Sequence, residues 1–208
     1  MVENDFIKSL QLKLLKPLPG ETAQEFMIPI KSININRGSN PRTACVLILF
    51  TPIEETWNIC LIQRQINPLD VHSGQISLPG GKLELTDNTH LDCALRETYE
   101  EIGIPSANIY PIGGLTSLYT SASNFNIHPF VGYMDQYPKF TLQTSEVQQV
   151  ITYPIHELIN PTSKNRTSIT LSNGLLIDNV PYYKSDHGII WGATAMILSE
   201  LEQILVSM

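Results

Sequence analysis

Two apolar runs, residues 43–50 and 57–65, constrain the fold more than any other part of the chain. They read TACVLILF and WNICLIQRQ, and a short polar loop that contains Pro52 separates them. A strand with one face in water alternates apolar and polar side chains, whereas these runs are almost continuously apolar. We therefore expect an antiparallel hairpin in the middle of a sheet that is covered on both faces.

Helices are predicted to supply that cover. Residues 89–102 show the clearest helical pattern, because apolar side chains recur at three- and four-residue spacing and Gly103 follows as a stop signal. A second amphipathic pattern spans residues 3–15, and a third spans about 190–206. Further strands are predicted at 74–81, 109–118, 126–134 and 147–153, with a second hairpin at 167–171 and 175–183 that turns at 172–174.

This order of elements predicts a mixed α/β (α+β) fold with one curved, mixed sheet. Residues 1–38 are interpreted as an N-terminal helix and a connecting arm, and residues 39–208 as the main domain. The helix at 3–15 carries apolar side chains that suit a contact with a second copy, so a homodimer is a possible assembly.

Composition excludes several classes of function. Of 208 residues, 42% are hydrophobic, and the formal net charge is −7. Nucleic-acid polymers bind basic surfaces, so we expect no such partner, although a small phosphorylated substrate remains compatible. No apolar run reaches the roughly 18 residues of a membrane span. The N-terminus lacks a signal-peptide pattern and the three cysteines are far apart, which together indicate a cytoplasmic protein with reduced, buried thiols.

The polar side of the helix at 89–102 carries Glu97, Glu100 and Glu101. These positions fall within one narrow sector of the helix and are expected to lie opposite its apolar stripe. A solvated acidic face is the ordinary interpretation of such a cluster. A metal site is the alternative, because a Pro-Gly-Gly turn at 79–81 precedes the helix and glycines let the backbone approach a ligand. Clustered carboxylates suit Mg²⁺ or Mn²⁺.

The chain resembles the Nudix family at this point. Gly81 followed by residues 96–104, RETYEEIGI, is similar to the Nudix box, with Thr98 in place of an aliphatic residue and a spacer one residue longer than usual. Residues 74–87, GQISLPGGKLELTD, resemble the coenzyme A diphosphatase-like branch of that family, with Leu78 as the departure. The similarity extends over about 17–206 and includes Arg64, His72, Ser123-Asn124-Phe125, Pro129 and Trp191-Gly192-Ala193-Thr194.

The resemblance implies a Nudix-type α/β/α sandwich and an enzyme that hydrolyses a P–O–P bridge with Mg²⁺ or Mn²⁺. It implies that Glu97, Glu100, Glu101 and the Gly81 carbonyl bind metal. The implied catalytic residues are Glu100, Glu101, Arg96, which orients a carboxylate, and Glu146, a loop acid that is the candidate general base. The residues expected to contact substrate are Arg64, His72 and Lys82.

The substrate is left open by one residue. The branch resemblance implies coenzyme A or a derivative, yet Asp70 stands where the branch has an arginine two residues before its histidine. An acid there disfavours a highly anionic ligand, so ADP-ribose, a dinucleotide or a nucleotide sugar is the alternative small-molecule substrate. An idle, nucleotide-binding regulatory domain is a further alternative, although such a domain would have no reason to keep three mutually repelling acids.

Overall fold

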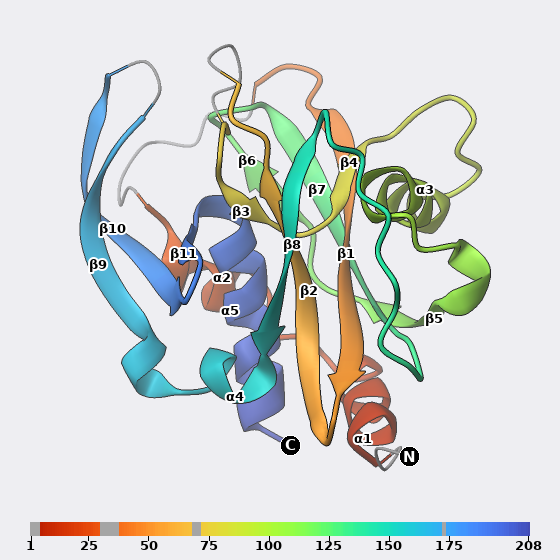
Figure 1. The fold of residues 1–208 in the computed structure, drawn as a ribbon. Helices are drawn as coiled ribbons and strands as arrows, with labels where there is room; N and C mark the ends of the chain where they lie inside the picture. Colours follow the sequence, from red (N-terminus) through yellow and green to blue (C-terminus); the bar gives the residue numbers. More distant parts are fainter. Residues whose placement is uncertain (1–4, 30–37, 68–71, 172–173) are drawn as a thin grey trace.

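The computed structural model describes residues 5–29, 38–67, 72–171 and 174–208. A mixed sheet lies between two helical layers, with α3 on one face and α5 on the other, while a smaller sheet stands beside α5 (Figure 1). The predicted Nudix-type α/β sandwich is confirmed. None of the helices in the described ranges is long and apolar enough to cross a membrane.

The large sheet contains β1 (Arg42–Ile53), β2 (Thr56–Arg64), β3 (Ile76–Ser77), β4 (Gly80–Lys82), β5 (Tyr110–Gly114), β6 (Leu118–Thr120), β7 (Phe125–Tyr133) and β8 (Val147–Pro154). β1 pairs with β7 in parallel, and the other pairs are antiparallel. The small sheet has the order β11 (Gly188–Trp191), β10 (Leu176–Ser185) and β9 (Lys164–Thr170). The helices are α1 (Asp5–Leu14), α2 (Glu21–Gln24), α3 (His90–Ile102), α4 (Ile155–Leu158) and α5 (Gly192–Val206), with 3-10 turns η1 (Glu25–Met27), η2 (Ser106–Asn108) and η3 (Pro161–Ser163).

The predicted central hairpin is confirmed as β1 and β2, and its burial explains the apolar runs. On β1, Cys45, Leu47 and Leu49 join the cluster under α3, while Ile48 and Phe50 face the α5 side. Each fully buried aliphatic side chain contributes about 1.5–3 kcal/mol. Pro52 lies within β1, opposite Trp57, and not in the loop as predicted, since the strands pair as far as Ile53 and Thr56.

The two strands of the central hairpin separate towards one end, and the candidate active site is built at this separation. β1 and β2 pair from their turn to Leu49 and Cys60, and then separate. The segment that contains β3 and β4 fills the gap: Ile62 pairs with Ser77, the Leu47 amide donates to the Pro79 carbonyl at 2.9 Å, and β4 pairs with β1. The Pro-Gly-Gly turn is thereby held inside the sheet, directly beneath α3.

Several predicted boundaries were wrong because tertiary pairing decided them. The segment 74–81 forms two short strands, and the segment 109–118 covers β5 and only the first residue of β6. The second hairpin belongs to a separate sheet that gains β11 where the last helix was expected to begin. The predicted connecting arm contains α2 and η1. The turn of the second hairpin includes residues 172–173, which lie outside the described residues.

The N-terminal helix packs on the same core as the large sheet. Ile7 and Leu10 of α1 are buried with Phe50 and Trp57, and the Phe6 ring lies 5.7 Å from that of Phe50. The boundary between residues 38 and 39 stays a prediction. Leu12 and Leu15 are exposed at the end of the helix, and the homodimer contact proposed for this segment also stays a prediction.

Candidate active site

Helix α3 is fixed at both ends by its own sequence. The Thr89 hydroxyl accepts a hydrogen bond from the Asp92 amide at 3.1 Å and caps the N-terminus. Gly103 ends the helix with φ 74°, and its amide donates to the Tyr99 carbonyl at 2.8 Å. Thr98, the departure from the Nudix box, is buried and donates its hydroxyl to the Ala94 carbonyl at 2.7 Å, so its polar atom is satisfied within the helix.

The glycines beneath the helix are required by close contacts. Gly80 has φ 148°, and a Cβ there would overlap the Cys45 carbonyl oxygen of β1. A Cβ on Gly81 would overlap the carboxyl group of Glu97. Any larger residue would displace a central strand in the first case and a candidate metal ligand in the second.

Glu101 is the most buried acid of the three. Its relative exposure is 2%, and the Gly80 amide donates to its Oε2 at 2.8 Å. Burial raises its pKa to about 8, and the nearby carboxylates of Glu97 and Glu146 act in the same direction. The Gly80 hydrogen bond and the charge of Arg64 oppose this rise. A carboxylate in this place is charged at neutral pH only when a positive charge compensates it.

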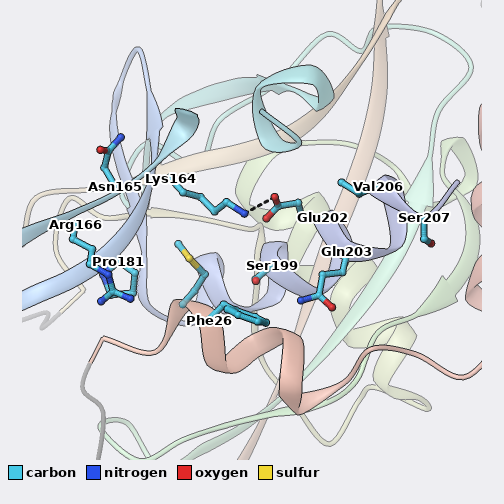
Figure 2. A pocket seen from close by; sticks show the side chains of 11 residues that line it. Phe26, Lys164, Asn165, Arg166, Pro181, Ser199, Glu202, Gln203, Val206 and Ser207 are labelled. Atoms are coloured by element: carbon cyan, nitrogen blue, oxygen red, sulfur yellow. Dashed lines mark hydrogen bonds and ion pairs between the residues drawn. The ribbon is translucent and has the colours of Figure 1, made fainter. Parts of the chain in front are cut away.

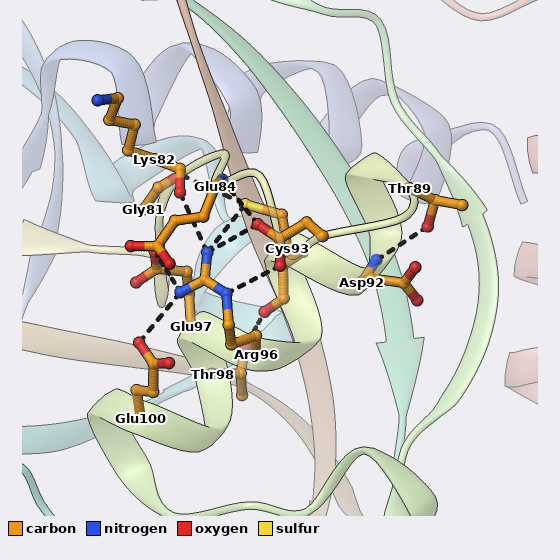
Figure 3. Close-up of polar contacts among 12 residues, drawn as sticks. Gly81, Lys82, Glu84, Thr89, Asp92, Cys93, Arg96, Glu97, Thr98 and Glu100 are labelled. Carbon is orange, nitrogen blue, oxygen red and sulfur yellow. Dashed lines mark hydrogen bonds and ion pairs between the residues drawn. The ribbon is translucent and has the colours of Figure 1, made fainter.

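The other two acids are held by Arg96, as Figure 3 shows. Arg96 Nη1 lies 3.0 Å from Glu97 Oε1 and 3.1 Å from Glu100 Oε2. The side chain of Glu97 is 14% exposed and that of Glu100 is 53% exposed. Burial raises the pKa of Glu97, Arg96 opposes this rise, and Glu100 and Glu146 add to it.

Asp87 anchors Arg96, although it is not among the predicted site residues. Its two oxygens accept from Arg96 Nε at 2.8 Å and from Nη2 at 2.9 Å, and Nη2 also donates to the Lys82 carbonyl at 3.1 Å. Hydrogen bonds from Arg96 lower the pKa of Asp87 to about 2, and Asp87 in turn raises the pKa of Arg96. The signal that could have identified Asp87 was its place as the last acid of the branch-like stretch 74–87.

The helical pattern predicted that the three acids lie opposite the core, and the structure differs from this prediction. Glu101 faces the core beside Ala94 and Ile102, Glu97 lies at the border, and only Glu100 is well exposed. The prediction was wrong because Glu101 and Ala94 are seven residues apart and therefore share a face of the helix. A buried acid next to two less buried ones is less easily explained as a solvated surface than the predicted arrangement was.

The donor set fits an oxygen-preferring divalent cation. The hydrogen bonds described above engage one oxygen each of Glu97, Glu100 and Glu101, and burial keeps the pKa values of Glu97 and Glu101 raised despite the nearby arginines, so an additional positive charge would stabilise their ionised forms. Within the described residues, no three side chains of His, Cys, Asp or Glu converge on one point in the present rotamers. Binding of an ion would therefore require the carboxylates to reorient around the fixed helix.

The structure brings two further predicted residues to the cluster. Arg64, at the end of β2, and Glu146, just before β8, are both close enough to Glu101 to influence its pKa. The Gln65 amide donates to the Glu146 carbonyl at 2.7 Å, which ties the loop acid to the end of β2.

The other predicted substrate residues lie at the edge of the cluster. The Lys82 carbonyl contacts Arg96, but its ammonium group points away from the carboxylates (Figure 3). His72 Nδ1 lies 3.2 Å from Gln75 Oε1 in the loop before β3. Asp70 lies outside the described residues. All three cysteines are buried and free, as predicted.

A cavity of about 990 Å³ lies away from the acid cluster, between η1, β9 and α5 (Figure 2). Its main charges neutralise one another, since Lys164 Nζ lies 2.6 Å from Glu202 Oε1 and the Tyr183 hydroxyl donates to Glu202 Oε2 at 2.6 Å. The acid cluster of α3 lies on the opposite side of the large sheet, so this cavity plays no part in it.

Comparison with known proteins agrees with this geometry. The NUDIX domain model matches residues 40–171. A protein from Yersinia pestis (strain Pestoides F), named as the uncharacterized Nudix hydrolase NudL, is 28% identical over 200 residues that cover 96% of this chain and 93% of the relative.

Solved structures share the fold at low identity. A Nudix hydrolase from M. smegmatis, RenU, aligns with a TM-score of 0.55 and 12% identity over 81% of this chain and 88% of its own. A MutT/nudix family protein from Enterococcus faecalis aligns with a TM-score of 0.54 and 15% identity over 96% of this chain and 74% of its own. The chain therefore belongs to the Nudix family and is a Nudix hydrolase, a pyrophosphohydrolase that acts on nucleoside diphosphate-linked compounds.

Proposed function

We propose that the chain hydrolyses the P–O–P bridge of its substrate with Mg²⁺ or Mn²⁺ held by Glu97, Glu100, Glu101 and the Gly81 carbonyl. The observation that carries this proposal is the burial of Glu101 beside Glu97, which leaves two acids with raised pKa values in contact with the Gly80-Gly81 turn. Buried carboxylates without a matching cation are costly, and a divalent ion removes that cost.

The bound cation supplies charge neutralisation of the phosphates and activation of the attacking water. Arg96 keeps Glu97 and Glu100 in position, and Asp87 keeps Arg96 in position. Glu146 accepts a proton from the water that attacks one phosphorus, the P–O bond to the bridging oxygen breaks, and a phosphate monoester leaves. Arg64 supplies positive charge to the substrate phosphates from the end of β2.

Coenzyme A or a derivative is the proposed substrate class, supported by the branch-like stretch 74–87. Asp70 favours the alternative compounds, ADP-ribose, dinucleotides and nucleotide sugars, because it adds negative charge where the branch has positive charge. We expect Asp70→Arg to raise kcat/KM for coenzyme A relative to ADP-ribose. If wild type already prefers coenzyme A and Asp70→Arg leaves the ratio of the two kcat/KM values unchanged, Asp70 does not determine specificity.

The test of the activity compares two substitutions of Glu to Gln. Glu101→Gln removes the buried ligand, whereas Glu55→Gln changes an exposed acid in the turn between β1 and β2. Each protein is incubated with coenzyme A, ADP-ribose, dinucleotides and nucleotide sugars in Mg²⁺, Mn²⁺ or chelator, and the products are identified by mass. We expect turnover in wild type and Glu55→Gln only with metal, and a loss of more than a hundredfold in Glu101→Gln. If Glu101→Gln stays within about tenfold of wild type, roughly 1.4 kcal/mol of barrier, the metal assignment is wrong; if wild type turns over nothing, the idle regulatory interpretation gains support.

A further inference from the structure

The loop that carries Glu146 is attached to the site at two places. It connects β7 to β8 and passes the C-terminal end of α3 (Figure 1). The Gln143 amide donates to the Glu101 carbonyl at 3.0 Å, so the loop is bonded to the residue that carries the most buried acid. Gln65, which follows β2, donates its backbone amide to the Glu146 carbonyl at 2.7 Å. The position of the loop is therefore tied both to α3 and to the end of β2.

A β-bulge directs this loop towards the acid cluster. Gln63 pairs with Gln149, but the next residue, Arg64, pairs with Val147, so Gln148 is an extra residue in β8. One inserted residue reverses the alternation of side chains along the strand, and Val147 is buried in the cluster under α3. The residue before Val147 is the loop acid, whose negative charge raises the pKa values of the two more buried acids of α3.

The side chain of Gln65 adds a second contact to this loop. Its Nε2 donates to the Thr144 carbonyl at 2.8 Å, two residues before the acid. The amides of Glu146 and Val147 donate to the Gln143 carbonyl at 2.9 and 2.8 Å and close a turn. Gln65 therefore holds this turn at two carbonyls, one through its backbone and one through its side chain. A substitution removes the side-chain contact and leaves the backbone contact in place.

A general base needs such a fixed position. It must stay within hydrogen-bond reach of the water whose proton it accepts, and an error of about 1 Å in the position of a reacting group can cost about a hundredfold in rate. Surface loops are more mobile than the elements they join, and the side chain of Glu146 is exposed. Repulsion from Glu97 and Glu101 also favours movement of this acid away from the cluster. Contacts that fix the backbone of the loop oppose that movement.

We propose that Gln65 is a positioning residue, whose side-chain amide holds the turn at 144–146 so that Glu146 stays directed at the acid cluster. The inference rests on the function proposed above, in which Glu146 accepts a proton from the attacking water. Gln65 acts through the loop and not on the substrate. Its loss should therefore slow the chemical step and leave substrate binding nearly unchanged.

Gln65→Met tests this role, because methionine keeps the approximate length of the side chain and cannot donate a hydrogen bond to the Thr144 carbonyl. The matched control is Gln148→Met, the same change at the exposed extra residue of the bulge. Hydrogen exchange of the Glu146 and Val147 amides is followed by NMR in the metal-free proteins, and kcat and KM are measured with Mg²⁺. Thermal melts show that each variant is folded.

We expect Gln65→Met to speed exchange of these two amides about fivefold or more, because the turn opens more often. It should lower kcat by about tenfold and leave KM within about twofold of wild type. Gln148→Met should change neither quantity. Glu146→Gln should lower kcat by about a hundredfold or more. Adding Gln65→Met to that variant should lower kcat by less than about twofold further, because the group that Gln65 positions is no longer there.

Three results would overturn the inference in an active protein. A rise in KM without a loss of kcat, or the same loss of kcat with and without Glu146, would mean that Gln65 acts on the substrate directly. An unchanged rate of exchange or an unchanged kcat would mean that its side chain does not position the base. If wild type hydrolyses no diphosphate compound, the proposed function fails, and hydrogen exchange of the two amides alone decides whether Gln65 positions the loop.

Discussion

Asp87, in the loop between β4 and α3, and Arg96 of α3 form a two-point ion pair, with Nε–Oδ1 at 2.8 Å and Nη2–Oδ2 at 2.9 Å. The same guanidinium reaches Glu97 and Glu100 with its third nitrogen. Because two of its three nitrogens are fixed by Asp87, the guanidinium has one orientation available for the carboxylates. The geometry of the candidate carboxylate ligands therefore depends on a residue that lies ten positions before the first of them, Glu97.

Asp87→Asn should lower turnover by more than tenfold and destabilise the fold by about 2 kcal/mol, because one strong acceptor of the pair is lost. The stability difference should depend on pH. The pKa of Asp87 lies at about 2 in the folded protein, below its usual 3.8, so the ion pair stabilises the fold above about pH 4 and this contribution is lost as the pH falls towards 2. Urea unfolding of wild type and variant between pH 3 and 7 checks this, with Glu84→Gln, an exposed acid of the same loop, as control. If the difference in free energy of unfolding between wild type and Asp87→Asn stays constant down to pH 3, the ion pair does not have the proposed role.

Gly81→Ala should impair the site more than the fold. The added Cβ overlaps the carboxyl group of Glu97, which is the flexible end of a side chain and can move aside. We expect the melting temperature without metal to change little, and the rise in melting temperature with Mn²⁺ to fall markedly. Combining Gly81→Ala with Glu97→Asp shortens the acid and should restore part of that rise. If the single variant responds to Mn²⁺ like wild type, Glu97 has no part in metal binding.

Glu101 predicts a pH-dependent cost in the metal-free protein. Its pKa is about 8 in the fold against 4.5 when exposed, so the folded state holds a proton that the unfolded state releases as the pH rises between these values. Stability should decline from pH 5 to pH 8, by at most about 1.4 kcal/mol per pH unit. Glu101→Gln should remove this decline, and Mg²⁺ or Mn²⁺ should reverse it in wild type only. If the stabilities of metal-free wild type and Glu101→Gln change with pH in the same way across this range, the prediction is wrong.

Glu200 is expected to act on stability alone. It is fully buried in α5 and accepts hydrogen bonds from the Gly20 amide at 3.1 Å, from Gln24 Nε2 at 3.0 Å and from the Thr116 hydroxyl at 2.6 Å. Glu200→Gln places an amide donor among these donors and should cost about 1–3 kcal/mol. Turnover per folded molecule should stay at the wild-type value at temperatures where the variant is folded. Glu25→Gln, an exposed acid of η1, serves as the control, and a variant as stable as wild type would disprove the role.

The sequence by itself determined the central hairpin, the helix α3 and the family. Continuous apolar runs have one stable solution, burial on both faces of a sheet, and they need no long-range information to be recognised. The same holds for the cap at Thr89, the stop at Gly103 and the close succession of Gly81, Arg96 and the three glutamates, because these are local signals read along the chain.

Only the tertiary structure decided how deeply each acid is buried and which residue anchors Arg96. Helical periodicity placed Glu101 with the other acids, but its burial depends on the Pro-Gly-Gly turn that enters the split between β1 and β2. Asp87 is separated from Arg96 by a loop whose path no local pattern specifies. Such contacts join segments far apart in sequence, and their free energy depends on packing that only the assembled fold creates.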